Sequence, residues 1–277
     1  MSLDPRNTLA RPDLAARSLE GLAAASAYAD PTPMTAAAPA AALRAAPDGD
    51  AEQVDQLLFG ETFEVLEERA GFCWGQAPRD GYVGYVARTD LAPLAPAPTH
   101  RVAAIRTYAF KDPSIKSRAL GPYSLGALVA VEAREGRFAK AAGCGWFVEA
   151  HLSSIGVFET DFVAVAQRYL GAPYLWGGRE SLGLDCSGLV QQALLACGRA
   201  CPRDTDQQAL MGQAVRAEVL LRGDLVFWRG HVAILLDPAT ILHANAHHMA
   251  VAVEPLAEAV ARIAATSTGQ PTGYRRI

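Results

Sequence analysis

Tyr174-Leu175-Trp176-Gly177-Gly178 is followed, after a short loop, by Asp185-Cys186-Ser187-Gly188-Leu189-Val190-Gln191-Gln192. These two segments predict an aromatic, glycine-rich turn that leads into a strongly apolar helix with a cysteine in its first turn. Unpaired backbone N–H groups and the positive end of the helix dipole favour a thiolate at such a position. Cys186 is therefore a candidate nucleophile.

The composition indicates a globular protein of more than one domain. The chain has 277 residues, of which 51% are hydrophobic and 19% charged, so it can bury a sizeable core. Its formal net charge of -4 and its pI near 5.9, with no local run of Lys and Arg, argue against nucleic acid as a partner.

Membrane and export signals are not expected. The low-charge stretch from Gly21 to Leu43 contains Asp30 and several prolines, so it could not hold a spanning helix. The first residues do not lead into the compact apolar core of a signal peptide. Five cysteines at irregular spacings suit free thiols in a reducing compartment. We expect a cytoplasmic protein without membrane association.

Residues 1–50 are predicted to form a short helix, Asp13 to Ala27, and then a proline- and alanine-rich stretch up to Pro47. Composition favours two interpretations of that stretch equally, an extended arm laid over the domains and a flexible tail.

From Asp55 the chain changes to short β-like runs between polar turns such as Arg79-Asp80-Gly81, which is typical of a small barrel. Pro93 to Pro98 is predicted to be a linker. The same order of apolar strand, glycine turn, aromatic pair and closing Asp-Leu or His-Leu then repeats. We expect two small all-β domains, at residues 51–95 and 96–154.

Residues 155–277 are predicted to form an α+β domain in which helices precede an antiparallel sheet. Asp161 to Leu170 has helical periodicity behind a Thr160 or Asp161 cap, and a second helix starts near Cys186. The later elements expected are strands at 221–228, 231–236, 241–244 and 251–253, a helix at 255–264, and a closing edge strand at 273–276.

Two histidines complete a possible catalytic set. A nucleophilic thiol needs a base close to the sulfur and a third group that holds the base's other nitrogen. His231 begins one strand and His243 lies on the returning strand, so a hairpin brings them to a cross-strand spacing of about 5 Å. We expect Cys186 to attack, His231 to take and return the proton, and His243 to orient His231. Asn245, on the same strand face, is the alternative orienting residue.

From about Phe162 to the C-terminus, the sequence resembles the NlpC family of papain-like peptidases. The resemblance rests on the two segments above and on Pro202-Arg203-Asp204-Thr205-Asp206-Gln207, Gly223-Asp224-Leu225-Val226-Phe227, Gly230-His231-Val232-Ala233-Ile234 and Leu242-His243-Ala244. It implies hydrolysis of peptidoglycan stem peptides between γ-D-glutamate and a diamino acid, usually meso-diaminopimelate. It also implies the same roles for Cys186, His231 and His243, and no metal or organic cofactor.

Residues 51–153 resemble the bacterial SH3-like domains that often precede such peptidases. Such domains bind peptides, form one wall of a site in a neighbouring domain, or merely pack against the next domain. The expected fold is thus an α+β papain-like, NlpC-type C-terminal domain preceded by two small all-β SH3-like barrels. In relatives that also carry SH3-like domains, the substrate has a free N-terminal L-alanine. The resemblance therefore implies recycling of L-Ala-γ-D-Glu-diamino acid peptides in the cytoplasm.

The resemblance implies further site residues. The hydroxyl of Tyr174 would join the Cys186 backbone N–H at the oxyanion. The expected substrate-binding residues are Asp185 for the free amine, Ser187 and Thr205 for the peptide, Trp176 in the tight turn, and Tyr82 and Glu61 of the first SH3-like domain, which would close the amine pocket.

Two other functions fit parts of the sequence. A catalytically silent module would bind a peptide through the SH3-like pair, although decay of such a domain normally removes one of the three catalytic residues. A papain-like acyltransferase would need apolar surroundings that exclude water.

A zinc site is not favoured, because no Cys-x-x-Cys pair accompanies Cys197, Cys201, His247 and His248. The choice between diaminopimelate and lysine and the oligomeric state stay open.

Overall fold

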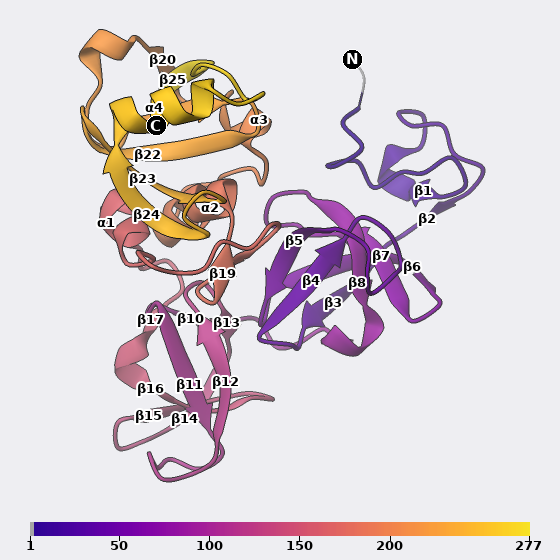
Figure 1. The fold of residues 1–277 in the computed structure, drawn as a ribbon. Coiled ribbons are helices and arrows are strands. Elements are labelled where there is room, and N and C mark those ends of the chain that lie inside the picture. The colour runs from indigo at the N-terminus through magenta and orange to yellow at the C-terminus, as the bar shows by residue number, and fades with distance from the viewer. Residues whose placement is uncertain (1–2) are drawn as a thin grey trace. The chain divides into compact units, whose positions relative to one another are not determined.

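The computed structural model describes residues 3–277 and divides the chain into two compact units, Met1–Val157 and Phe158–Ile277 (Figure 1). The first unit is almost entirely β-structure, whereas the second combines helices with one larger sheet. Within residues 3–277, no helix is both long enough and apolar enough to cross a lipid bilayer.

The helix expected at Asp13 to Ala27 is wrong. Leu9 and Ala16 are buried against Trp74 of the following sheet, and Gly21 takes a left-handed φ of 81° in the middle of the expected helix. A helix of this length is marginal by itself, and burial of its apolar side chains on a sheet competes with it. The elements present are β1 (Ala15–Ala16), η1 (Arg17–Leu19, a 3-10 turn) and β2 (Tyr28–Ala29), with β1 and β2 paired in parallel.

The first β-region, defined here as residues 32–93, contains a seven-stranded antiparallel sheet. In spatial order its strands are β5 (Gln53–Leu58), β4 (Ala40–Arg44), β8 (Val83–Ala87), β7 (Phe72–Gln76), β6 (Thr62–Arg69), β3 (Thr32–Ala36) and β9 (Leu91–Pro93). The prediction of an arm or tail is therefore wrong at residues 32–44, which form two of these strands. Ala41 and Leu43 alternate into the core and are fully buried, so small alanines serve here as inward-facing strand residues.

The second β-region, defined here as residues 100–154, contains a three-stranded and a five-stranded sheet. Their spatial orders are β13 (Leu128–Val129), β10 (His100–Val102) and β17 (Leu152–Ser154), and β12 (Ala119–Ser124), β11 (Arg106–Phe110), β16 (Gly145–Val148), β15 (Phe138–Ala141) and β14 (Val131–Glu135). Each β-region closes with a 3-10 turn before its last strand, η2 (Arg88–Asp90) in the first and η3 (Glu149–His151) in the second. This shared ending agrees with the repeat seen in the sequence.

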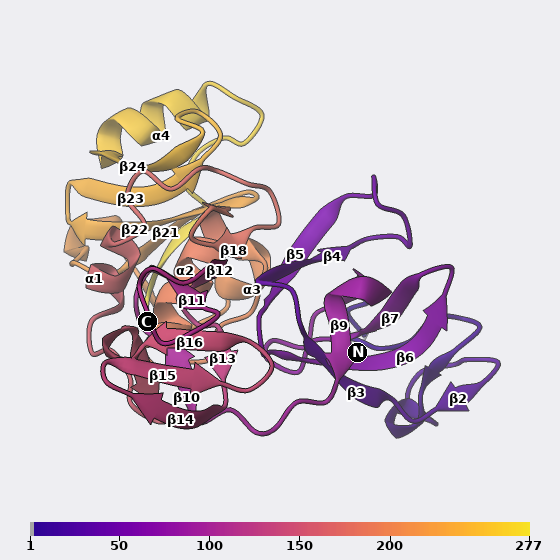
Figure 2. The same ribbon diagram turned by 90° about the horizontal axis from the view of Figure 1, so that it is seen from below.

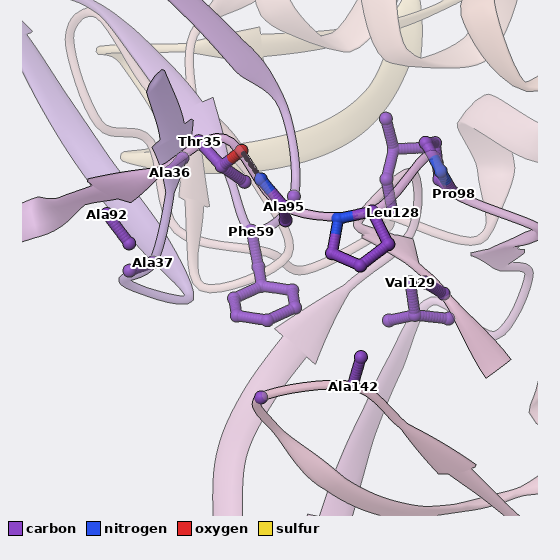
Figure 3. A pocket seen from close by; sticks show the side chains of 14 residues that line it. Thr35, Ala36, Ala37, Phe59, Ala92, Ala95, Pro98, Leu128, Val129 and Ala142 are labelled. Atoms are coloured by element: carbon purple, nitrogen blue, oxygen red, sulfur yellow. Dashed lines mark hydrogen bonds between the residues drawn. The ribbon is translucent and has the colours of Figure 1, made fainter. Parts of the chain in front are cut away.

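An apolar pocket of about 120 Å³ lies where the two β-regions adjoin (Figure 3). The linker enters it through Ala95, whose N–H donates to Thr35 Oγ1 at 2.9 Å. Beside it, the Leu128 N–H donates to the Phe59 carbonyl at 2.8 Å. Gly60 makes this approach possible, because a Cβ there would lie 2.1 Å from the Leu128 carbonyl oxygen. None of the lining residues within the described range 3–277 is charged, so the pocket does not suit a charged peptide.

The second unit is organised on a six-stranded antiparallel sheet. In spatial order its strands are β20 (Gln213–Val215), β25 (Gly273–Arg276), β21 (Leu225–Trp228), β22 (His231–Asp237), β23 (Thr240–Asn245) and β24 (Ala250–Pro255). The expectation that residues 273–276 form an edge strand is wrong, because β20 pairs outside β25. A three-residue strand, Gln-Ala-Val, carries too little pattern to be recognised in sequence.

Helices lie on both sides of this sheet (Figures 1 and 2). On one side, Ala259 and Ile263 of α4 pack with Leu235 and Ile241 of the sheet. On the other side, α2 packs on β22 and β23. The helices and short elements of the unit are α1 (Phe162–Gln167), β18 (Arg179–Glu180), β19 (Gly183–Leu184), α2 (Cys186–Ala196), α3 (Thr205–Gln208), η4 (Ala217–Val219) and α4 (Leu256–Ala264).

Candidate active site

Helix α2 begins at Cys186, as the sequence predicts. Asp185 is its N-cap, and the Gly188 N–H donates to Asp185 Oδ1 at 2.8 Å. A glycine is required at position 188, because a Cβ there would lie 2.3 Å from the Gly178 carbonyl oxygen. The glycine-rich turn thus packs directly on the first turn of α2, and this packing buries the Cys186 side chain to 5% exposure.

The thiol of Cys186 lies at the start of β22, where its sulfur accepts a hydrogen bond from the Val232 N–H. Burial, with a smaller contribution from the Asp185 charge, raises the pKa of the Cys186 thiol to about 12. The expected stabilisation of a resting thiolate is therefore wrong for this structure. Loss of hydration outweighs the helix N-terminus and the Arg203 charge, so the thiol needs a base at the moment of attack.

His231 and His243 are hydrogen-bonded to each other, with 2.8 Å between His231 Nε2 and His243 Nδ1. His231 is the first residue of β22, next to the residue whose N–H binds the sulfur. Burial lowers the pKa of both imidazoles to about 3, and the positive charge of Arg262 also lowers the pKa of each ring. Both rings are therefore neutral near pH 7, and His231 can accept a proton.

Asn245 does not take the orienting position. Its Oδ1 accepts from the His248 N–H at 2.8 Å and lies 2.9 Å from His248 Nδ1. Its Nδ2 donates to the His243 carbonyl at 3.3 Å. Asn245 thus holds the turn between β23 and β24, in which His247 and His248 are exposed.

Asp185 and Ser187 are tied to a buried arginine that sequence reasoning missed. Arg203 is 1% exposed and binds Asp185 through both oxygens, with Nη1 3.0 Å from Oδ1 and Nη2 2.6 Å from Oδ2. Its Nη1 also donates to Ser187 Oγ at 2.8 Å. We call this group, Asp185, Ser187 and Arg203, the Asp185 clamp. Its signal was present in the sequence, because Arg203 lies in one of the family motifs.

The clamp leaves Asp185 fully hydrogen-bonded. Its two oxygens accept from the N–H groups of Gly177 and Gly188, from the Ser187 hydroxyl and twice from Arg203. A carboxylate offers roughly four lone-pair directions. The geometry therefore supports a structural role for Asp185 more directly than the expected contact with a substrate amine.

The other expected site residues of this unit are Tyr174, Trp176 and Thr205. Tyr174 lines a pocket of about 220 Å³ together with His231 and His243, and burial together with the nearby Cys186 and Asp185 charges raises the pKa of its hydroxyl. Trp176 is 56% exposed, which leaves its ring surface accessible. Thr205 is the first residue of α3.

Glu61 and Tyr82 belong to the first β-region, where both are buried. Tyr82 packs in the core of the sheet. Glu61 Oε2 accepts from Arg79 Nη1 at 2.6 Å and from the Leu58 N–H at 2.9 Å. Arg79 also binds Asp55 at 2.7 Å and Asp80 at 2.6 Å, so three carboxylates surround one guanidinium.

Two further residues extend the histidine pair and were not expected. His243 Nε2 lies 2.7 Å from Glu254 Oε1, and Arg262 of α4 binds the same oxygen. The signal in the sequence was weak: Glu254 is the one charged residue in the otherwise apolar strand β24.

Among residues 3–277, one group of three metal-ligand side chains is close together, His243, His248 and Glu254, and it contains none of the cysteines. The contact between His243 and Glu254 is a hydrogen bond. Two ligands of a tetrahedral zinc ion with bonds of 2.0–2.1 Å would lie about 3.3 Å apart. The arrangement therefore suits proton positioning better than metal binding.

Comparison with known families defines the class of the protein. Residues 171–267 match the NlpC/P60 family, and residues 43–91 match the bacterial dipeptidyl-peptidase Sh3 domain. The chain therefore contains an NlpC/P60 domain preceded in sequence by a bacterial dipeptidyl-peptidase Sh3 domain, and it is a cysteine peptidase, a hydrolase.

Particular relatives share most of its length. Dipeptidyl-peptidase 6 of Lysinibacillus sphaericus is 26% identical over 73% of this chain and 84% of its own. The gamma-D-glutamyl-L-lysine dipeptidyl-peptidase of Bacillus subtilis is 26% identical over 74% of this chain and 76% of its own. In fold, the chain is similar to the crystal structure of an NlpC/P60 family protein from Bacillus cereus, with a TM-score of 0.74 over 88% of this chain and 99% of that one, at 19% identity.

Proposed function

We propose that the protein hydrolyses the bond between γ-D-glutamate and a diamino acid, meso-diaminopimelate or L-lysine, in peptidoglycan stem peptides. The observation that carries the proposal is the placement of Cys186 at the start of α2, against the first residues of β22, with His231 bonded to His243. The names of the two long relatives, a dipeptidyl-peptidase and a gamma-D-glutamyl-L-lysine dipeptidyl-peptidase, support this substrate class.

Acylation starts from a protonated Cys186 thiol and a neutral His231. His231 takes the Cys186 proton as the sulfur attacks the γ-carbonyl carbon, which forms the S–C bond and an oxyanion. The Cys186 N–H and the Tyr174 hydroxyl are the donors proposed for that oxyanion. His231 then gives its proton to the amine of the diamino acid as the C–N bond breaks, and a thioester remains on Cys186.

Deacylation repeats these steps with water. His231 takes a proton from the water as its oxygen attacks the thioester carbon. The C–S bond then breaks, and the proton returns to the sulfur. The products are the free diamino acid and a peptide that ends in γ-D-glutamate. His243 holds His231 in position through both half-reactions.

We also propose that the enzyme prefers peptides with a free N-terminal L-alanine, as a dipeptidyl-peptidase would. The supporting feature in the first β-region is the cluster of Asp55, Glu61 and Asp80 around Arg79. With three carboxylates and one guanidinium, the formal charge of this cluster is -2 (-3 + 1), which is complementary to a cationic amine. Ser187, Thr205 and Trp176 are the proposed peptide contacts, and Asp185 acts through the clamp.

This proposal includes the finer organisation of the chain. The two β-regions are two SH3-like barrels, and residues from about 155 to 277 are a papain-like α+β domain. None of the cysteines within residues 3–277 is placed in a disulfide bond, a state that a reducing compartment favours. We therefore propose recycling of stem peptides in the cytoplasm as the setting.

Two peptides test the substrate preference, L-Ala-γ-D-Glu-meso-diaminopimelate and its N-acetylated form. We expect release of diaminopimelate from the free-amine peptide only. The matched variant is Arg79→Met, which removes the single cation from the cluster and should change the ratio of the two kcat/KM values. Equal cleavage of both peptides by the native protein would contradict the amine preference and leave the hydrolysis intact.

A further inference from the structure

A continuous line of hydrogen bonds crosses three strands and ends on α4. His231 on β22 bonds to His243 on β23 at 2.8 Å, and His243 bonds to Glu254 on β24 at 2.7 Å. Arg262 binds Glu254 at the same oxygen that faces the histidine. His243 is 1% and Glu254 9% exposed, so water competes little for these contacts. We call His231, His243 and Glu254 the histidine relay.

The sheet register builds this line. In the β23–β24 pair, His243 lies opposite Ala252 and Ile241 lies opposite Glu254. Because side chains two residues apart share a sheet face, Glu254 is the diagonal neighbour of His243 on that face. The same face is covered by α4, which carries Arg262 one residue before the buried Ile263. Arg262 therefore holds the Glu254 side chain in place from the helix.

The carboxylate of Glu254 determines where the protons lie. An ionised carboxylate only accepts hydrogen bonds, so the proton in the 2.7 Å contact is on His243 Nε2. A neutral imidazole has one N–H, so His243 Nδ1 must accept, and His231 Nε2 must donate to it. His231 Nδ1 is then left with its lone pair. This is the nitrogen that remains for the thiol of Cys186.

We propose that Glu254 is a positioning residue that fixes the tautomers of both histidines and so presents an unprotonated His231 Nδ1 to Cys186. The proposal rests on the proposed roles of Cys186 and His231. The other charged or titratable groups near His243 are His231 on β22, His247 and His248 in the turn after β23, and Arg262 on α4. Glu254 is the acceptor among them that binds the His243 ring.

The substitution Glu254→Gln separates this role from simple packing. Glutamine keeps the shape of the side chain, but its amide can turn so that the N–H donates to His243 Nε2 while the carbonyl oxygen accepts from Arg262, and this arrangement reverses both tautomers. His231 Nδ1 would then carry the proton and could not accept one from the thiol. We expect kcat/KM to fall about 10⁴-fold, as kcat does when the tautomer is reversed in a serine peptidase triad. Glu254→Asp keeps an obligatory acceptor and should retain more activity than the glutamine variant.

The matched control is Asp224→Asn. Asp224 is also a buried carboxylate of this sheet, paired with Arg276 at 2.7 Å, but it has no contact with either catalytic histidine. Thermal unfolding of both variants shows how much each loses in stability. We expect the asparagine variant to keep its kcat under conditions in which it stays folded.

The direct measurement is ¹⁵N NMR of protein labelled in the histidine rings, assigned with His231→Gln and His243→Gln. The native protein should show protonated Nε2 and bare Nδ1 in both rings, and Glu254→Gln should move the His231 proton to Nδ1. A native His231 with its proton on Nδ1 would overturn the proposal. The proposal would also be overturned if folded Glu254→Gln kept full activity while Cys186→Ala was inactive. If Cys186→Ala stays active, the proposed function fails, but the NMR spectra still decide the tautomers.

Discussion

The Asp185 clamp and the histidine relay both contain a buried carboxylate paired with an arginine, yet they differ in where their hydrogen bonds end. In the clamp, the donors around Asp185 are backbone N–H groups, a hydroxyl and Arg203, and none of them can accept a proton. In the relay, Glu254 binds an imidazole that binds a second imidazole. In the proposed mechanism, a buried carboxylate serves catalysis when its hydrogen bonds lead to a proton acceptor, and it serves the fold when they do not.

The largest expected effect is on the relay side of this comparison. Cys186→Ala or His231→Ala should lower kcat by about 10⁴-fold or more, because a nucleophile and its base, the roles proposed for these residues, act as a unit. The double variant should be no worse than either single one. Release of diamino acid measures activity, and circular dichroism confirms folding. Additive losses in the double variant would mean that the two residues do not act together.

On the clamp side, the expected effect is on stability. Arg203→Met leaves Asp185 buried without its cation, which should cost roughly 3–5 kcal/mol of unfolding free energy. Urea unfolding measures this loss. Adding Asp185→Asn should recover part of it, since no uncompensated charge then remains. A large loss of kcat with unchanged stability would instead make the clamp part of the chemistry.

The dependence of activity on pH distinguishes the relay from the clamp, because only the relay contains a base. His231 must be unprotonated to accept the thiol proton, and its pKa is lowered to about 3 from an ordinary value of 6.5. Activity should therefore persist as the pH falls below 6.5 and be lost only as the pH falls toward the lowered pKa. The measurement is kcat/KM against pH over the range in which the protein stays folded. A half-maximal point near pH 6.5 would show that burial does not lower this pKa.

The smallest effect on stability is expected at an exposed pair of a carboxylate and an arginine. Asp161 caps α1 and binds Arg222 at 2.7 Å, and their side chains are 42% and 47% exposed. Arg222→Gln should change stability by about 1 kcal/mol or less, because water screens an exposed ion pair. Asp161→Ala, which also removes the cap, should cost about 1 kcal/mol more. A loss from Arg222→Gln as large as that from Arg203→Met would contradict the importance given to burial.

Sequence reasoning located the elements whose signals are local. Cys186 at a helix start and His231 and His243 on adjacent strands follow from motif order and strand periodicity, and the structure places them so. The helix expected at Asp13 to Ala27 failed because Ala16, with Leu14 and Leu19 beside it, packs on Trp74 of the first sheet, a tertiary effect that local propensity does not contain. Strands β3 and β4 were missed for a similar reason, since proline and alanine masked their alternation.

The parts of the site that sequence reasoning missed depend on register and burial. The partnership of Glu254 with His243 requires the alignment of β23 with β24, which no local pattern supplies. The raised pKa of Cys186 was missed because the sequence shows the helix N-terminus but not the desolvation that opposes it. Arg203 was visible in a motif, but its ion pair with Asp185 appears only when the two segments, 18 residues apart, are folded together.

The most direct test of γ-D-glutamyl hydrolysis by Cys186 is product analysis by mass spectrometry, with native protein and Cys186→Ala under reducing conditions and L-Ala-γ-D-Glu-meso-diaminopimelate as substrate. We expect the native protein to release L-Ala-γ-D-Glu and free diaminopimelate, each in one-to-one yield, and the folded variant to release neither. Cleavage at another bond, transfer of the L-Ala-γ-D-Glu group to an added amine in place of water, or no reaction of the native protein would contradict this expectation.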